Sequence, residues 1–331
     1  MKITDLRCVV LGENPIVRIV TDAGIDGYGE VESTKPYVTQ HVLFFRDALV
    51  GEDPTNVERV MLKIRQRGSF KPWGSAVSAI EMALWDVAGK AAGLPIYKLL
   101  GGKIRDRVRV YNGGVRFPMA GYNPEDYAES TRRMLDAPEG FTIVKQPIGF
   151  HSPMKREVPN FFYGEARPAG GLHGALDRGA LTERGLKHLV ACVEAMKEVT
   201  GDAVGLALDC GPGFAPNDAL RVARAVELLN LLWLEDMITG DYTPYVLADL
   251  YRDVTWATTT PIHTGEQIYL RQNFKDLIDQ RAVNVVGPDP ADVGGIAELK
   301  WIAEYADLNG ILMAPHGVFD GLIGLAALVQ V

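Results

Sequence analysis

Apolar and polar positions follow two different periods along the chain. In the first hundred residues, short apolar runs at Ile3–Leu11, Ile16–Thr21 and Gly27–Val31 are separated by turn residues, which predicts three β-strands. From Ser75–Ala92 the apolar positions fall on one face of a helix, and Gly-Leu-Pro follows as a stop signal. Strands followed by helices predict an α+β domain over residues 1–107.

From Val108 onward the pattern becomes a repeat in which an apolar strand ends at a polar residue and an amphipathic helix follows. Such alternation predicts a parallel sheet, and this many repeats predicts a closed β/α barrel over residues 108–331. An eighth strand is not visible before Val331, so we expect the barrel to lack its C-terminal part. The seven predicted strands are VRVYNGG, FTIVKQP, VGLALD, LLWLED, TTPIHTGE, AVNVVGPD and GILMAPH.

The segment from His151 to Arg184 interrupts the repeat between the second and third barrel strands. It is rich in proline, glycine and aromatic residues. A loop of this length in a compact domain is usually functional or disordered.

Composition narrows the class of protein. The chain has 331 residues, of which 47% are hydrophobic and 23% charged, a composition typical of globular proteins. Its formal net charge of -8 argues against nucleic-acid binding. Three cysteines without a CxxC spacing predict neither a disulfide framework nor a zinc site. The N-terminus lacks a signal-peptide pattern, and no apolar run reaches the roughly 18 residues of a membrane span. We therefore expect a cytoplasmic protein without a membrane partner.

The polar residues at the strand ends carry the candidate chemistry. Five consecutive barrel strands end in Asp209, Glu235, Glu266, Asp289 and His316. Taken singly, a carboxylate after a strand is ordinarily solvated or caps the next helix. Because parallel strands lie about 4.8 Å apart, three carboxylates on adjacent strands converge and repel one another. A hard divalent cation relieves that repulsion, and oxygen ligands favour Mg²⁺.

The last two strand ends suggest an acid–base pair. A lone His316 is most simply a hydrogen-bonded core residue. Here it follows a strand beside the predicted metal site, and Asp289 ends the neighbouring strand. A carboxylate beside a histidine orients the imidazole and raises its basicity, so we interpret the pair as functional.

These motifs resemble those of the enolase superfamily, mandelate racemase subgroup. The resemblance extends over essentially the whole chain, with the motifs in the family's order. They are ALWDVAGKAAGLPIYKLLGG, ALD, WLED, TGEQ, GPDPADVGGI and APHG.

The resemblance implies a capping α+β domain on a (β/α)7β barrel. It implies that Asp209, Glu235 and Glu266 hold Mg²⁺, and that His316, paired with Asp289, is the general acid/base. The reaction step shared by the family is removal of the proton α to a carboxylate. Members are often homo-oligomers, so we expect one here.

Where the chain departs from the family's pattern, the reaction is in question. Lys145 matches the first lysine of the KxK motif and would contact the substrate carboxylate, but Pro147 replaces the second and cannot act as a base. His316 is an evident base for one face of the substrate carbanion, and no second base is evident for the other face. We therefore expect a dehydratase of aldonic or aldaric acids that yields a 2-keto-3-deoxy product. His151 or His173 could supply the acid, although each could equally be a solvated loop residue.

Other interpretations stay open. Glu32 and Trp73 fall where the family's capping loops reach over the barrel, and could bind substrate or simply pack the domain interface. The runner-up function is a racemase or epimerase of a 2-hydroxy or amino acid. A metal- and carboxylate-binding protein without turnover is a second alternative, and Schiff-base aldol cleavage through Lys145 is a third.

Overall fold

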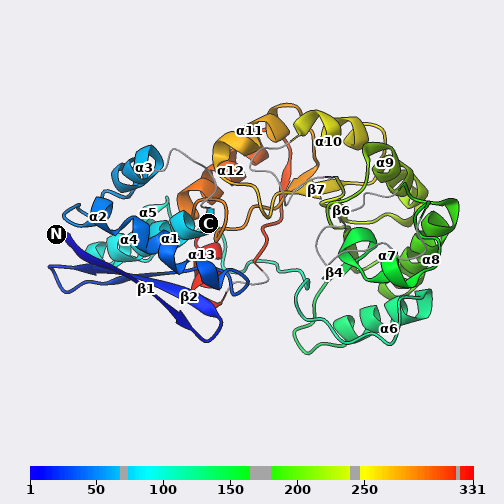
Figure 1. Ribbon diagram of the computed structural model, residues 1–331, viewed down its shortest axis with the longest axis horizontal. Helices are drawn as coiled ribbons and strands as arrows, with labels where there is room; N and C mark the ends of the chain where they lie inside the picture. Colours follow the sequence, from blue (N-terminus) through cyan, green and yellow to red (C-terminus); the bar gives the residue numbers. More distant parts are fainter. Residues whose placement is uncertain (68–73, 165–179, 239–246, 318–320) are drawn as a thin grey trace.

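The chain folds into an N-terminal unit of strands and helices and a larger ring of strands and helices, which lie side by side in Figure 1. In the part of the chain that the structure describes, no helix is both long and apolar enough to cross a membrane. This computed structural model describes residues 1–67, 74–164, 180–238, 247–317 and 321–331.

The N-terminal unit begins with an antiparallel three-stranded sheet in the order β1-β2-β3. The strands are β1 (Ile3–Leu11), β2 (Asn14–Thr21) and β3 (Gly27–Glu30), as the sequence predicted. Along β2, fully buried positions such as Val17 and Ile19 alternate with half-buried ones. One face of the sheet is therefore covered, and its cover is a helix.

That helix is α4 (Gly74–Ala92), which confirms the helix predicted over Ser75–Ala92. It lies so close to β3 that a Cβ atom at Gly27 or Gly29 would overlap the backbone carbonyl of Ala83 or Ala79. Glycine at both positions is what allows this close packing of helix on strand. The other helices of the unit are η1 (Pro36–Val38), α1 (Thr39–Phe44), α2 (Arg46–Leu49), α3 (Val57–Arg67) and α5 (Ile96–Leu99).

The larger unit is built on a parallel six-stranded sheet in the order β4-β5-β6-β7-β8-β9, with helices around its outside (Figure 1). Sequential neighbours throughout the sheet are the topology expected of a β/α barrel. The strands are β4 (Ile143–Pro147), β5 (Gly205–Asp209), β6 (Trp233–Glu235), β7 (Ile262–Thr264), β8 (Val285–Val286) and β9 (Leu312–Met313). The outer helices are α6 (Pro124–Leu135), α8 (Glu183–Thr200), α9 (Pro216–Ala225), α10 (Ala248–Thr255), α11 (Arg271–Asp279) and α12 (Ile296–Leu308), and η3 (Glu227–Leu229) follows α9.

The prediction of a full strand over VRVYNGG is wrong. Within residues 108–114 only Asn112 pairs, through an isolated parallel bridge to Val144. The side chains of Val108 and Val110 are 53% and 60% exposed, so neither gains the burial that rewards strand formation. The other six predicted barrel strands are present, in shorter form.

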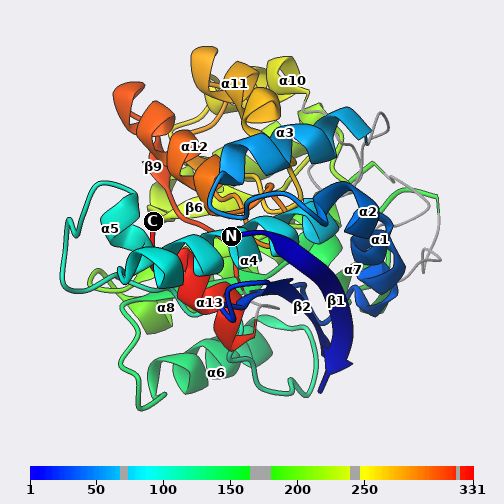
Figure 2. The same ribbon diagram turned by 90° about the vertical axis from the view of Figure 1, so that its left-hand side faces the viewer.

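Buried polar contacts fix the N-terminal unit over one end of the ring. Glu81 of α4 accepts hydrogen bonds from the backbone N–H groups of Ile296 and Ala297 at 2.7 and 2.9 Å, the first turn of α12. Arg65 of α3 pairs with Glu298 at 2.7 Å. Figure 2 shows α3 and α4 beside α12. Because α12 follows β8, these contacts hold the N-terminal unit near the carboxyl ends of the strands.

The segment that begins at His151 and the C-terminal helix complete the described part of the chain. After β4 come η2 (Gly149–His151) and α7 (Met154–Glu157), but residues 165–179, with His173, lie outside the described residues. The helix α13 (Leu322–Leu328) lies against β3. The boundary predicted between residues 107 and 108 stays a prediction.

Candidate active site

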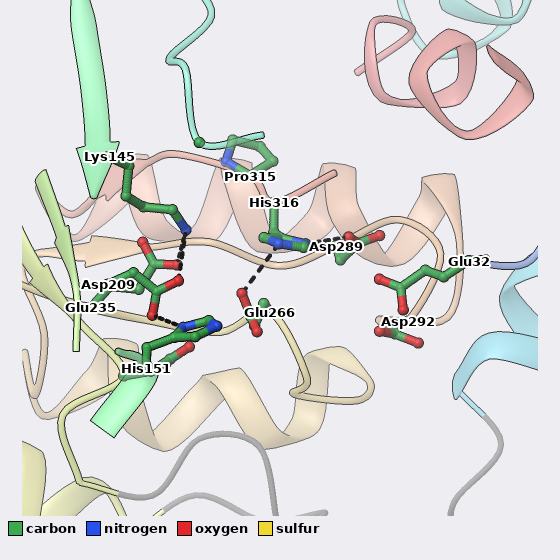
Figure 3. A network of polar contacts seen from close by, with 12 residues as sticks. Glu32, Lys145, His151, Asp209, Glu235, Glu266, Asp289, Asp292, Pro315 and His316 are labelled. Carbon is green, nitrogen blue, oxygen red and sulfur yellow. Dashed lines mark hydrogen bonds and ion pairs between the residues drawn. The ribbon is translucent and has the colours of Figure 1, made fainter. Parts of the chain in front are cut away.

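Three carboxylates meet at the carboxyl ends of neighbouring strands. Asp209 and Glu235 are register partners at the last positions of β5 and β6, and Glu266 lies just beyond β7. Asp209 and Glu235 are 4% and 0% exposed, and Glu266 is half-buried. Figure 3 shows the three side chains directed toward a common region. Among the described residues, however, the acidic trio whose oxygens all lie within 4.8 Å of one another is Glu235, Asp236 and Glu266, without Asp209.

Two nitrogen-bearing side chains lie among these acids. Lys145 of β4 pairs with Glu235 and its Nζ lies 3.8 Å from Asp209 Oδ2. His151 places Nδ1 at 2.6 Å from Asp209 Oδ1. Burial would raise the pKa of Asp209, but Lys145 and His151 outweigh it and hold that pKa well below its usual range. Burial opposes the charge on Lys145, yet Glu235 raises its pKa well above the ordinary value, so the ammonium stays protonated.

The acids suit a hard divalent cation in their chemistry. The ligand atoms of Glu235, Asp236 and Glu266 all lie within 4.8 Å of one another, and all are oxygens. Burial raises the pKa of Glu266, although His316 and Lys145 oppose the rise. Asp236 was not predicted, although it stands next to Glu235 in the WLED motif and has a positive φ of 50°.

A histidine–carboxylate pair borders the acid cluster. His316 Nδ1 lies 2.7 Å from Asp289 Oδ2, and His316 Nε2 lies 3.3 Å from Glu266 Oε2. The other Asp289 oxygen accepts the Ala291 N–H at 2.7 Å, which fixes the carboxylate. Burial would lower the pKa of His316, but Glu266 and Asp289 together raise it to about 10. The predicted pairing of His316 with Asp289 is thus present as a contact.

A layer beneath the acids was missed by the sequence reasoning. Trp233 Nε1 donates to Glu235 Oε2 at 2.8 Å, and the Trp233 ring stacks on His263 with centroids 5.1 Å apart. Tyr111 also contacts Trp233 in an edge-on arrangement, with ring centroids 5.4 Å apart. The available signal was the alternation in the strand, which puts Trp233 on the same side as Glu235.

The N-terminal unit contributes Glu32 to the site. Glu32 is 1% exposed, and its ligand atom lies within 4.8 Å of those of Asp289 and His316. Burial, with Asp292 and Asp289 nearby, raises the pKa of Glu32 to about 7. Trp73, the other predicted capping residue, lies outside the described residues.

Comparison with known protein families gives two matches along the chain. Residues 10–101 match the mandelate racemase/muconate lactonizing enzyme N-terminal domain, and residues 126–331 match the enolase C-terminal domain-like family. The second match alone spans more than half of the chain. The chain belongs to the mandelate racemase/muconate lactonizing enzyme family.

Relatives and solved structures are similar over nearly the full chain. A D-xylonate dehydratase of Haloferax volcanii is 34% identical over 100% of this chain and 75% of its own length. A D-galactonate dehydratase of Variovorax paradoxus is 30% identical over 100% of this chain and 78% of its own. An enolase from Pantoea ananatis, crystallised with bound D-gluconate and Mg, is 25% identical with a TM-score of 0.82, over 99% of this chain and 81% of that one.

At the position where the sequence resemblance implies a second lysine, the chain has Pro147. Pro147 is the last residue of β4 and pairs in register with Asp209. A pyrrolidine ring offers no proton acceptor there. Basic groups among the described residues here include Lys145, which pairs with Glu235, and His151, which pairs with Asp209. His263 Nδ1 also lies 3.3 Å from Glu235 Oε2.

Proposed function

We propose that the protein is a Mg²⁺-dependent dehydratase that converts a sugar acid to its 2-keto-3-deoxy product. One observation carries the proposal: the oxygens of Glu235, Asp236 and Glu266 lie within 4.8 Å of one another at the strand ends, and a histidine–carboxylate pair lies beside Glu266. The names of the similar enzymes, which include D-xylonate and D-galactonate dehydratases, support the substrate class.

In the proposed mechanism each residue has one task. Asp209, Glu235 and Glu266 would hold the cation, which when bound stabilises negative charge on the substrate carboxylate. Lys145 would pair with the same carboxylate as a permanent cation. His316 Nε2, once unprotonated, would take the α-proton, and Asp289 would hold Nδ1–H and stabilise the imidazolium.

The second half of the reaction expels the β-hydroxyl. We propose that His151 donates a proton to that oxygen, so that water leaves and an enol remains, which tautomerises to the 2-keto-3-deoxy acid. Its Nδ1 contact with Asp209 would orient the ring for this step. His173 stays an alternative donor.

Two observations weigh against the alternatives. A racemase needs a second proton-transfer group opposite His316, and Pro147 stands where the family's second lysine would be. Schiff-base chemistry needs an unprotonated lysine, whereas the Glu235 carboxylate raises the pKa of Lys145. The remaining alternative, a binding protein without turnover, is distinguished from an enzyme by assaying for product.

The test is incubation with Mg²⁺ and a panel of aldonic and aldaric acids in heavy water, followed by NMR. We expect a 2-keto-3-deoxy product, and we expect none from His316→Asn. The matched control His41→Asn changes an exposed histidine of α1 and should retain turnover. Recovered substrate that carries α-deuterium without any keto acid would contradict dehydration and support epimerisation. Binding without exchange or product would support the non-catalytic alternative.

A further inference from the structure

The capping residue Glu32 presents an unused hydrogen-bond acceptor to the site. Its Oε2 lies 2.8 Å from Lys35 Nζ and 3.3 Å from Thr34 Oγ1. Its Oε1 is buried and has no hydrogen-bond partner among the described residues. A buried carboxylate oxygen is costly to leave unsatisfied, so a donor from outside the protein is expected to occupy this position.

The Glu32 carboxylate lies beside the proton-transfer pair. Glu32, Asp289 and His316 each place a ligand atom within 4.8 Å of the other two. In Figure 3 the Glu32 carboxylate lies on the Asp289 side of His316, and Lys145 lies on the opposite side. A substrate whose α-carbon is at His316 and whose carboxylate is at Lys145 therefore has Glu32 toward its remaining hydroxyl-bearing carbons.

Charge differs sharply between these two ends. At the Lys145 end, Lys145 and His151 accompany the acids that would hold the cation. At the Glu32 end, the carboxylates of Glu32, Asp289 and Asp292 are grouped together.

The cation at the Glu32 end is already engaged. Lys35 Nζ lies 2.6 Å from both carboxylate oxygens of Asp292 and also pairs with Glu32. Asp292 additionally accepts a hydrogen bond from Ser75, which fixes it in place. A further anion placed here would find no uncommitted positive charge among the described residues.

From this geometry we infer that Glu32 accepts a hydrogen bond from a distal hydroxyl group of the substrate and thereby selects aldonic acids over aldaric acids. The inference rests on the proposed function and narrows its substrate class. A hydroxyl group is a donor that the unused oxygen can accept. The second carboxylate of an aldaric acid is an acceptor only and carries a like charge, so it would be repelled.

The experiment compares kcat/KM for two matched pairs, D-gluconate with D-glucarate and D-galactonate with galactarate, at pH 8 with Mg²⁺. Each pair differs at the terminal carbon, CH₂OH against carboxylate. We expect the wild-type protein to prefer the aldonate by about 100-fold or more. Glu32→Gln, which removes the charge at nearly constant shape and keeps an acceptor oxygen, should reduce this preference at least tenfold, with most of the change a rise in kcat/KM for the aldarate.

Two further variants keep the result interpretable. Glu81→Gln alters another buried carboxylate of the same unit, away from His316, and should leave the aldonate-to-aldarate ratio unchanged. Glu32→Asp retains the charge but withdraws it by one methylene, and should retain more of the preference than Glu32→Gln. If Glu32→Gln unfolds at a much lower temperature than wild type, the comparison with Glu32→Asp decides the question.

The possible outcomes separate this inference from the proposed function. Turnover of both acid classes with the same ratio in wild type and Glu32→Gln overturns the inference and leaves the dehydratase proposal standing. A wild-type preference for aldarates also overturns it, because Lys35 would then be released to pair with the second carboxylate. No turnover of any of the four acids overturns the proposed function and this inference with it.

Discussion

Lys145→Met is the substitution whose consequence follows most directly from the charges in the site. The Lys145 ammonium and the Glu235 carboxylate are paired, and their residues are 2% and 0% exposed. Removing one partner of a buried ion pair typically costs about 3–5 kcal/mol, because the other charge remains buried without compensation. We therefore expect the variant to lose stability by that amount in the presence of a chelator.

Mg²⁺ should restore much of this loss. In the wild-type protein, the Lys145 ammonium lies 3.8 Å from Asp209, a proposed metal ligand, and so competes with the cation for negative charge. At an effective dielectric constant of about 20, two unit charges at such a distance interact by about 4 kcal/mol. Even a third of that energy makes Mg²⁺ bind about tenfold tighter to Lys145→Met, which adds about 1.4 kcal/mol of stabilisation at saturating metal.

The assay is urea unfolding of both proteins with a chelator and with excess Mg²⁺. We expect Mg²⁺ to stabilise Lys145→Met more than it stabilises the wild type, although the variant should lack turnover. Arg271→Met is the matched control, because it removes a 2.7 Å ion pair with the buried Glu298 outside the proposed metal site. Its stability should fall without a greater response to Mg²⁺. Equal Mg²⁺ stabilisation of wild type and Lys145→Met would refute the reasoning.

Three further predictions concern neighbouring groups. Asp289→Asn should lower the rate of α-proton exchange by about 10²- to 10⁴-fold, measured by NMR in heavy water, because His316 loses its orienting carboxylate. Trp233→Phe, which removes the N–H bound to Glu235, should weaken Mg²⁺ binding about 10- to 100-fold by calorimetry. Burial raises the pKa of Glu81 from 4.5 to about 8, so its contribution to stability is lost as the pH rises through 8. Between pH 6 and 9, the free energy of unfolding of Glu81→Gln should therefore fall by about 2 kcal/mol less than that of the wild type.

The fold was predictable where burial follows a simple period. The three N-terminal strands and α4 were found because their apolar positions alternate every second residue or recur every helical turn. The strand at 108–114 was overpredicted from the same kind of pattern, because the sequence shows that Val108 and Val110 are apolar but not that they remain exposed. Burial depends on neighbours that are distant in the chain.

The site was predictable as far as it depends on strand ends. Asp209, Glu235 and Glu266 come from adjacent strands, so their approach follows from topology alone. The contact between Glu32 and the His316 region could be suggested only by resemblance, since it depends on how the N-terminal unit docks. The pairing of Lys145 with Glu235 was not foreseen, because a side-chain rotamer leaves no mark in the sequence.

The central claim is that Asp209, Glu235 and Glu266 jointly bind one divalent cation beside His316. The most direct test is a crystal structure of the protein with Mn²⁺, in which anomalous scattering locates the ion independently of the protein. The account predicts a peak about 2.0–2.2 Å from one oxygen of each carboxylate, with Lys145 moved away from Glu235. A peak among Glu32, Asp289 and His316, or none while Lys145 keeps its pairing, would contradict it.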